Sequence, residues 1–304
     1  MSISKLPILV FGATGQQGGS VAAALRAAGW PVRALVRDPA SAKSAALRAA
    51  GIDVVPGDFD DAASLHAAMQ GVHGVFSVQP SSPTGIIGDD DEVRYGVSVA
   101  DTAQESGVAH LVYSSGGAVG ERPTGMGHFE SKARIEAHLR TLPLAVTVIR
   151  PAAFMEMLVM PGFGLDQGTF NFFVRPDQAI QLQAVEDIGK TVAAIFADGP
   201  RFKGQTIDIA SDAVTGRDLE RLFTEAAGFP IRYARFSDEV LAANPFLRKL
   251  TDLVDDGILS GKADLDFCRA LNPEQQTLRA WLAGTGRQAF KDALGTSGTW
   301  AYNE

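Results

Sequence analysis

Residues 6–19 read Leu6-Pro7-Ile8-Leu9-Val10-Phe11-Gly12-Ala13-Thr14-Gly15-Gln16-Gln17-Gly18-Gly19, and this stretch decides the fold. A short apolar run of strand length leads into glycines spaced G-x-x-G-x-x-G, and apolar residues at helical spacing follow them. The free N–H groups at the start of such a helix bind a pyrophosphate, because the glycines let the backbone approach closely. A plain glycine-rich turn between a strand and a helix gives a similar pattern, so the rest of the chain has to support this interpretation.

The composition is that of a globular protein with room for a large core. The chain has 304 residues, of which 46% are hydrophobic and 20% charged, and its formal net charge is −8. This acidic balance, without a basic cluster, argues against a nucleic-acid partner. The single cysteine, Cys268, excludes an internal disulfide, and no apolar run approaches the roughly 20 residues that span a bilayer. We therefore expect a cytoplasmic protein that does not associate with a membrane.

Strand and helix patterns alternate through the first half of the chain. Such alternation builds βαβ units, and near-continuous apolar strands indicate a parallel sheet with helices on both faces. The sequence therefore predicts an α/β fold with a Rossmann-type, doubly wound parallel sheet. The strand patterns cover residues 8–11, 32–36, 53–56, 74–78, 110–113 and 145–149, and the helix patterns cover residues 18–28, 41–50, 62–69, 92–106 and 130–139.

The alternation breaks after Pro151. A phenylalanine-rich stretch, 163–173, suits either an apolar lid or wall beside a substrate or packing in a core. Further on, a helix is expected to begin after Thr215, because Asp218 stands three residues later as in a capping box. The last third of the chain reads as mostly helical.

Two domains are expected from this change of pattern. Residues 1–151 form the predicted dinucleotide-binding Rossmann domain, which residues 184–203 rejoin. Residues 152–304 form a smaller, mostly helical lobe for a substrate or a partner. Ligands of open α/β sheets bind outside the carboxyl ends of the strands, so we expect this lobe to cover that edge.

Residues after the second and third predicted strands suit the adenosine part of a dinucleotide. Arg37 can pair with a 2′-phosphate, which favours NADP(H) while leaving NAD(H) possible. The alternative is a surface arginine that only ends a strand, and the neighbouring Asp38 weakens the NADP preference. Asp58 can accept from the adenine amino group, and Phe59 can cover the adenine ring. One of the acids after Phe59 is also expected to cap the next helix.

A histidine and a lysine are the candidate catalytic residues. In His128-Phe129-Glu130-Ser131-Lys132 they stand four residues apart, on one helical face. Such a pair is most often solvated, but its place after the fifth strand favours a role near the nicotinamide, more for Lys132 than for His128. The acidic run 88–92 reads as the start of a helix, and no histidine or cysteine spacing suits a metal, so no metal site is predicted.

Several motifs resemble the NmrA-like family of atypical short-chain dehydrogenase/reductase proteins. The resemblance covers nearly the whole chain and is closest to the branch of NADPH-sensing redox sensors. The motifs that carry it are Gly12-Ala13-Thr14-Gly15-Gln16-Gln17-Gly18-Gly19, Val36-Arg37-Asp38-Pro39, Gly57-Asp58-Phe59-Asp60-Asp61, Leu111-Val112-Tyr113-Ser114-Ser115, His128-Phe129-Glu130-Ser131-Lys132, Ile149-Arg150-Pro151-Ala152-Ala153-Phe154-Met155-Glu156 and Leu271-Asn272-Pro273 with Thr277-Leu278-Arg279-Ala280-Trp281-Leu282.

The resemblance implies an NADP(H) site and assigns residues to it. This chain departs from the family pattern at two positions. His128 replaces the catalytic tyrosine of a Tyr-x-x-x-Lys pair. Ser41 replaces a basic residue near Arg37, which is expected to weaken binding of the 2′-phosphate. The implied pyrophosphate loop is Gly12, Thr14, Gly15, Gln16, Gln17 and Gly18; Arg37 takes the 2′-phosphate, Asp58 and Phe59 the adenine, and Gln79, Lys132 and Phe154 the ribose and nicotinamide.

Two functions follow as hypotheses. The first is an NADP(H)-dependent reductase with an apolar substrate, since an imidazolium at His128 can act as an acid. Lys132 is expected to lower the pKa of His128, which favours a quinone, because its reduced oxygens need an acid less than those of a ketone. The second is a sensor that binds NADP(H), acts through a protein partner and turns nothing over.

Overall fold

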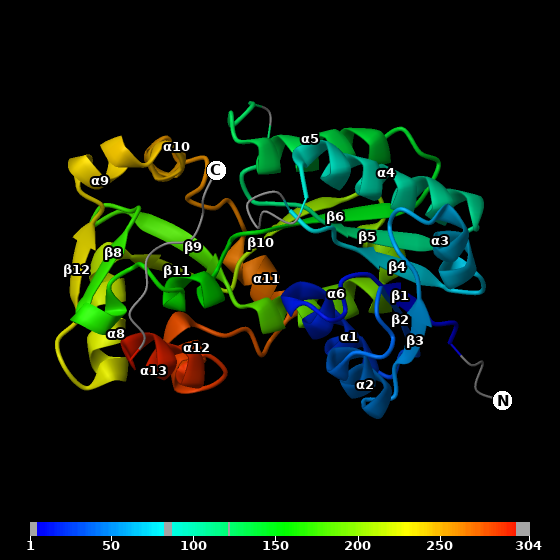
Figure 1. The fold of residues 1–304 in the computed structure, drawn as a ribbon, viewed down its shortest axis with the longest axis horizontal. Helices are drawn as coiled ribbons and strands as arrows, with labels where there is room; N and C mark the ends of the chain where they lie inside the picture. Colours follow the sequence, from blue (N-terminus) through cyan, green and yellow to red (C-terminus); the bar gives the residue numbers. More distant parts are fainter. Residues whose placement is uncertain (1–4, 82–86, 121, 296–304) are drawn as a thin grey trace. The chain divides into compact units, whose positions relative to one another are not determined.

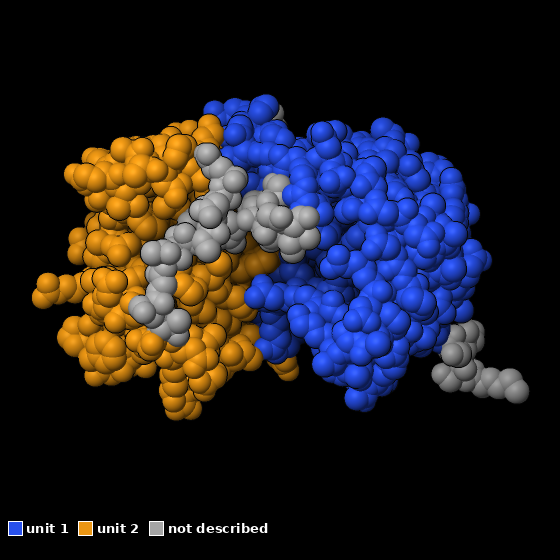
Figure 2. All heavy atoms as spheres, in the orientation of Figure 1, with its two compact units in different colours: residues 1–150, 185–207 blue, residues 151–184, 208–304 orange. Residues whose placement is uncertain are grey.

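The computed structural model describes residues 5–81, 87–120 and 122–295. The chain forms two compact units (Figure 2). Residues 1–150 and 185–207 make the first unit, and residues 151–184 and 208–304 make the second.

The first unit is built on a seven-stranded sheet with the strand order β10-β6-β5-β4-β1-β2-β3. From β3 to β6 all neighbouring strands pair in parallel, and the order 3-2-1-4-5-6 is that of a Rossmann fold. The predicted fold class is therefore confirmed. The strands are β1 (Ile8–Val10), β2 (Val32–Val36), β3 (Asp53–Pro56), β4 (Gly74–Ser77), β5 (His110–Ser114), β6 (Val146–Pro151) and β10 (Thr206–Ile209).

Helices cover both faces of this sheet (Figure 1). One face carries α3 (Ala62–Met69), α4 (Asp89–Glu105) and α5 (Gly127–Leu139), and the other carries α1 (Gln16–Ala27), α2 (Ala42–Ala49) and α6 (Val185–Ala197). The core under α3, α4 and α5 is apolar, with Leu9, Val75 and Leu111 fully buried. A short α7 (Gly199–Phe202) leads into β10.

Several elements begin earlier than the sequence pattern predicts. The helix α1 starts two residues before the expected Gly18, and α4 and α5 each start three residues before theirs. These extra turns are polar or glycine-rich, so apolar periodicity does not include them. The acidic run is the first turn of α4, as predicted, but its N-cap is Gly88 and no side chain caps it by a hydrogen bond.

The second unit combines helices with two small sheets. Between β10 and residue 295, where the described chain ends, six helices agree with the predicted mostly helical lobe. Sequence reasoning missed the short strands of this unit, which are two to five residues long. Among the described residues the elements are β7 (Ala153–Phe154), η2 (Met155–Val159), η3 (Leu165–Gln167), β8 (Thr169–Phe172), β9 (Ala179–Gln183), β11 (Asp212–Thr215), α8 (Gly216–Ala227), β12 (Arg232–Arg235), α9 (Asp238–Ala243), α10 (Pro245–Asp255), α11 (Leu265–Leu271), α12 (Leu278–Ala283) and α13 (Arg287–Gly295).

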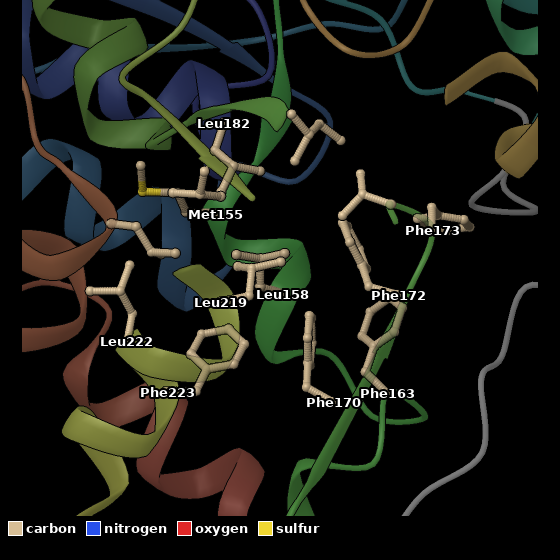
Figure 3. Packing of buried hydrophobic residues seen from close by; sticks show 14 of the residues in the cluster. Met155, Leu158, Phe163, Phe170, Phe172, Phe173, Leu182, Leu219, Leu222 and Phe223 are labelled. Atoms are coloured by element: carbon tan, nitrogen blue, oxygen red, sulfur yellow. The ribbon is translucent and has the colours of Figure 1, made fainter. Parts of the chain in front are cut away.

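The phenylalanine-rich stretch forms the core of this second unit (Figure 3). Phe163 and Phe170 are 1% and 0% exposed, and their ring centroids lie 5.6 Å apart. Phe172 and Phe173 are buried beside them. Of the two roles that the sequence left open, the structure therefore supports core packing, and the lid is wrong.

Two local predictions about helix caps are also confirmed. Thr215 and Asp218 form a capping box at α8. Asp61 caps α3 by accepting from the backbone N–H groups of Ala63 and Ser64. In the part of the chain that the structure describes, no helix is long and apolar enough to cross a membrane.

Candidate functional site

The glycine loop between β1 and α1 is a tight crossing of two backbones. Gly12 adopts a φ of +66°, where a residue with a side chain is strained. A Cβ on Gly18 would stand 2.3 Å from the carbonyl carbon of Gly12, so only glycine fits there. The Gly15 N–H donates to the Gly12 carbonyl at 2.8 Å and closes the turn. The three glycines of the motif therefore have the separate steric roles that a dinucleotide loop requires.

The start of α1 is open for an anion. Its N-cap is Gly15, which supplies no side-chain acceptor, and its first turn holds no acid. The first N–H groups of the helix lack intrahelical partners, and the helix dipole adds positive potential. Gly15 and Gln16 are exposed and Thr14 is half-buried, whereas the Gln17 carbonyl oxygen Oε1 accepts from Ser114 Oγ at 2.7 Å. Gln17 is thereby tied to the end of β5, a link that the sequence did not reveal.

Arg37, at the end of β2, is an exposed cation without a hydrogen bond or ion pair to any described residue. The carboxylate of Asp38 does not pair with it, because Asp38 Oδ1 accepts from the Ala40 N–H at 2.8 Å. Ser41 caps α2 by accepting from the Ser44 N–H at 3.2 Å. The acid that weakened the NADP prediction is therefore engaged in a local turn, and Arg37 can receive a phosphate.

The residues after β3 have structural partners. Asp58 Oδ1 accepts from the Asp60 N–H at 3.0 Å. The Phe59 ring stacks against Phe11 at 5.4 Å and against Tyr95 at 5.0 Å. Phe59 is thus held between two rings, a packing role that the sequence did not indicate, and its contact with adenine stays a prediction.

Gln79, two residues beyond β4, has a buried polar atom without a hydrogen-bond partner in the described part of the chain. It is only 9% exposed, and its Nε2 donates to Ser77 Oγ at 2.8 Å. Its Oε1 is buried and has no hydrogen-bond partner among the described residues. Buried polar atoms are almost always paired, so this oxygen is suited to accept from a ligand donor such as a hydroxyl or an amide. The observation fits the implied place of Gln79 near a ribose or nicotinamide.

Lys132 on α5 lies in a buried hydrogen-bonded cluster, defined here as the Lys132 cluster, with Ser81, Glu92 and Ser131. Its Nζ is 2.5 Å from Glu92 Oε1 and 3.0 Å from Ser81 Oγ. The Glu92 side chain is 2% exposed and that of Lys132 is 16% exposed. The sequence placed Glu92 in a helix start and did not reveal this pairing. The signal that could have found it is its position one turn into α4, on the face that packs on α5.

His128 is neutral at pH 7 and is not an imidazolium that could donate a proton. Its pKa is lowered to about 4, first by burial and then by the charge of Lys132, against the opposing effect of Asp89. The expected effect of Lys132 is confirmed, and the larger effect of burial is new. The ring lies 4.1 Å from that of Phe129.

These residues are distributed over both units. All predicted site residues except one belong to the first unit, and they follow β1, β2, β3 and β4 or lie on α1 and α5. Phe154 is half-buried in β7 of the second unit, and its role at the cofactor stays a prediction. No group of acids, histidines and cysteines among the described residues is arranged to hold a metal ion.

The glycine loop, the open helix start, the exposed Arg37 and the buried Gln79 together fit a phosphorylated dinucleotide. A sequence profile of the NmrA-like family matches residues 4–256. The chain belongs to the NmrA-like family. The resemblance seen in the motifs is thereby confirmed at the level of the family.

Curated relatives of this NmrA-like protein include oxidoreductases. It is 31% identical over 264 residues to the NmrA-like family domain-containing oxidoreductase malD of Malbranchea aurantiaca, covering 79% of this chain and 78% of that one. It is 29% identical over 234 residues to the NAD(P)H azoreductase of Xenophilus azovorans, covering 76% and 78%.

Solved structures share the fold of this NmrA-like protein. The negative transcriptional regulator NmrA in complex with NADP matches with a TM-score of 0.78 at 20% identity, over 95% of this chain and 98% of that one. An NADPH-dependent quinone oxidoreductase from Escherichia coli, complexed with NADPH, matches with a TM-score of 0.74 at 24% identity, over 91% and 99%. At these identities the likeness concerns the fold alone.

Proposed function

We propose that this NmrA-like protein binds NADP(H) and transfers hydride from NADPH to a quinone or a related carbonyl compound. The observation that carries the cofactor preference is Arg37, an exposed guanidinium without a partner in the described structure, at the strand end where a 2′-phosphate binds. The oxidoreductases among its relatives support the reductase function. NAD(H) is a possible second cofactor, because Ser41 supplies no charge to the phosphate.

The residues of the first unit have distinct roles in this proposal. The N–H groups of α1 hold the pyrophosphate, and the glycines allow its close approach. In this proposal Asp58 and Phe59 contact the adenine, and Gln79 and Phe154 are assigned to the ribose or nicotinamide end. When bound, the reduced nicotinamide supplies the hydride. The second unit is the substrate or partner lobe, and the single cysteine suits a cytoplasmic protein.

A regulatory function is the second candidate, supported by a specific observation. The tyrosine of the usual Tyr-x-x-x-Lys pair is His128 here, and with a pKa of about 4 it is neutral at pH 7 and donates no proton readily. In this case the protein senses NADP(H) and acts through a protein partner.

Calorimetric titration tests the cofactor claim. The wild-type protein is expected to bind NADPH more tightly than NADH, and Arg37→Ala to weaken NADPH binding by about tenfold or more, as the loss of a charge-assisted phosphate contact implies. NADH binding should change less than threefold. Arg232→Ala, an exposed arginine of β12 in the second unit, is the matched control. Equal losses for both dinucleotides in Arg37→Ala would refute the phosphate role.

Turnover separates the reductase from the regulator. NADPH absorbance is followed with a panel of benzoquinones and naphthoquinones. Loss of absorbance that depends on enzyme and quinone supports the reductase. Tight NADPH binding without oxidation by any acceptor favours the sensor.

A further inference from the structure

The ammonium of Lys132 has as many acceptors around it as it has protons. Its Nζ lies 2.5 Å from Glu92 Oε1, 3.0 Å from Ser81 Oγ and 3.1 Å from the carbonyl oxygen of His128. A lysine side chain carries three donors and no acceptor. The three acceptors match the three donors of the ammonium, so in this arrangement none is left for a substrate oxygen.

Glu92 holds this arrangement from the neighbouring helix. Its second oxygen, Oε2, accepts from Ser131 Oγ at 2.8 Å and from Ser81 Oγ at 3.2 Å. Three elements thus converge on one buried carboxylate: α4, α5 and the segment after β4. Because Glu92 is nearly inaccessible to water, moving the ammonium away would leave a buried charge without compensation.

We propose that Glu92 is a positioning residue that keeps the Lys132 ammonium hydrogen-bonded to protein atoms. The site then transfers hydride without a proton donor from the protein. This inference rests on the proposed function. It narrows the substrate to acceptors whose reduced form is stable before protonation, namely quinones and similar conjugated, electron-poor compounds. Isolated ketones and aldehydes are excluded, because their alkoxide products need an acid.

The reaction balances without a protein acid. The acceptor takes two electrons and one proton as hydride from the reduced nicotinamide, whose C4–H bond breaks. A quinone becomes a hydroquinone monoanion with its charge spread over an aromatic ring, and its second proton comes from water. His128 does not substitute for the missing acid, because it is already neutral well below pH 7.

Several titratable groups surround the Lys132 ammonium and determine what would happen if it left Glu92. Glu92 and Asp89 face this region from α4, His128 and Glu136 from α5, and Tyr113 from β5, where its buried hydroxyl senses both glutamates. Glu92 is the one that contacts the ammonium among the described residues. Without its charge, the ammonium would lose its closest acceptor and could donate to another oxygen.

The test compares four variants with the wild type: Lys132→Met, Glu92→Gln, the double variant, and Glu105→Gln as the exposed matched control on α4. NADPH affinity is measured first by calorimetry. The turnover number is then measured with 1,4-naphthoquinone and with benzaldehyde between pH 6 and 9. A wild type that fails to bind NADPH or to reduce the quinone contradicts the proposed function itself.

The proposal predicts that the wild type reduces the quinone at a pH-independent rate and leaves benzaldehyde unreduced. Lys132→Met should keep the quinone turnover number within tenfold. Glu92→Gln, which removes the strongest acceptor of the ammonium, should acquire measurable benzaldehyde reduction, which Glu105→Gln and the double variant lack. A larger loss in Lys132→Met at unchanged NADPH affinity, or a Glu92→Gln variant that still leaves benzaldehyde unreduced, overturns the proposal. If a single variant does not fold, the double variant decides by the same tenfold limit.

Discussion

At the scale of single residues, Gly18 shows how tightly the loop is specified. Its missing side chain lets α1 cross the Gly12 backbone, and a Cβ would come within 2.3 Å of it. Gly18→Ala should destabilise the protein by about 1–3 kcal/mol through overpacking and weaken NADPH binding by displacing the start of α1. Denaturant unfolding and calorimetry measure the two effects.

The matched control for this substitution is Gly295→Ala. A Cβ at Gly295 meets no atom within 4 Å, so the unfolding midpoint should move little. If Gly18→Ala were as mild as this control, the close crossing of the two backbones would be wrong.

The same residues show what a sequence can predict. The role of Gly18 follows from motif spacing, because a steric requirement at this position allows only glycine. The partners of Asp38 and Phe59 do not, since they depend on how a turn closes and on which rings meet across strands. The pairing of Glu92 with Lys132 was missed for the same reason, as it joins two residues that are 40 positions apart and lie on different helices.

At the scale of elements, a buried charge joins α5 to β5 and β6. Glu136 on α5 is fully buried and accepts from Ser115 Oγ at 2.6 Å and from Arg150 Nε and Nη2 at 2.9 and 2.6 Å, while the exposed Arg140 is a third partner at 2.7 Å. Removing one partner of a buried ion pair costs about 3–5 kcal/mol, because the other charge is left without compensation. We therefore expect Glu136→Gln to lower the free energy of unfolding by about this amount.

Arg140→Ala is the control within the same cluster. Its side chain is 60% exposed, and a solvated ion pair contributes at most about 1 kcal/mol. Chemical denaturation of both variants checks the contrast. Similar losses for Glu136→Gln and Arg140→Ala would show that burial does not set the strength of this cluster.

Element order was predictable where element boundaries were not. Alternating apolar runs are enough to place β1 to β6 and the helices between them, because both faces of a parallel sheet are buried. The strands of the second unit could not be predicted in this way, since a strand as short as β7 is too short to show an alternating apolar pattern. Its phenylalanines could be recognised as apolar but not assigned to a core until β8 and α8 were seen to enclose them.

At the scale of the whole molecule, buried neutral histidines make stability depend on pH. His110 is 1% exposed, its Nε2 lies 2.8 Å from Thr147 Oγ1, and burial, reinforced by the charge of Lys203, lowers its pKa to about 4. An unfolded histidine has a pKa of about 6.5. Between about pH 4 and 6.5 the unfolded chain therefore binds a proton at this residue and the folded chain does not. The stability from this residue is complete above pH 6.5 and is lost as the pH falls towards 4.

The loss due to His110 amounts to about 3 kcal/mol, from a shift of about 2.5 pH units at roughly 1.36 kcal/mol each. Urea unfolding at pH 7, 5.5 and 4.5 should show a falling free energy in the wild type. His110→Asn should flatten this fall, because an amide can keep a hydrogen bond to Thr147 without titrating. His66→Asn, at an exposed position on α3, should leave it unchanged. A fall of the same size in His110→Asn would assign the acid sensitivity to other groups, beginning with His128, whose pKa is also about 4.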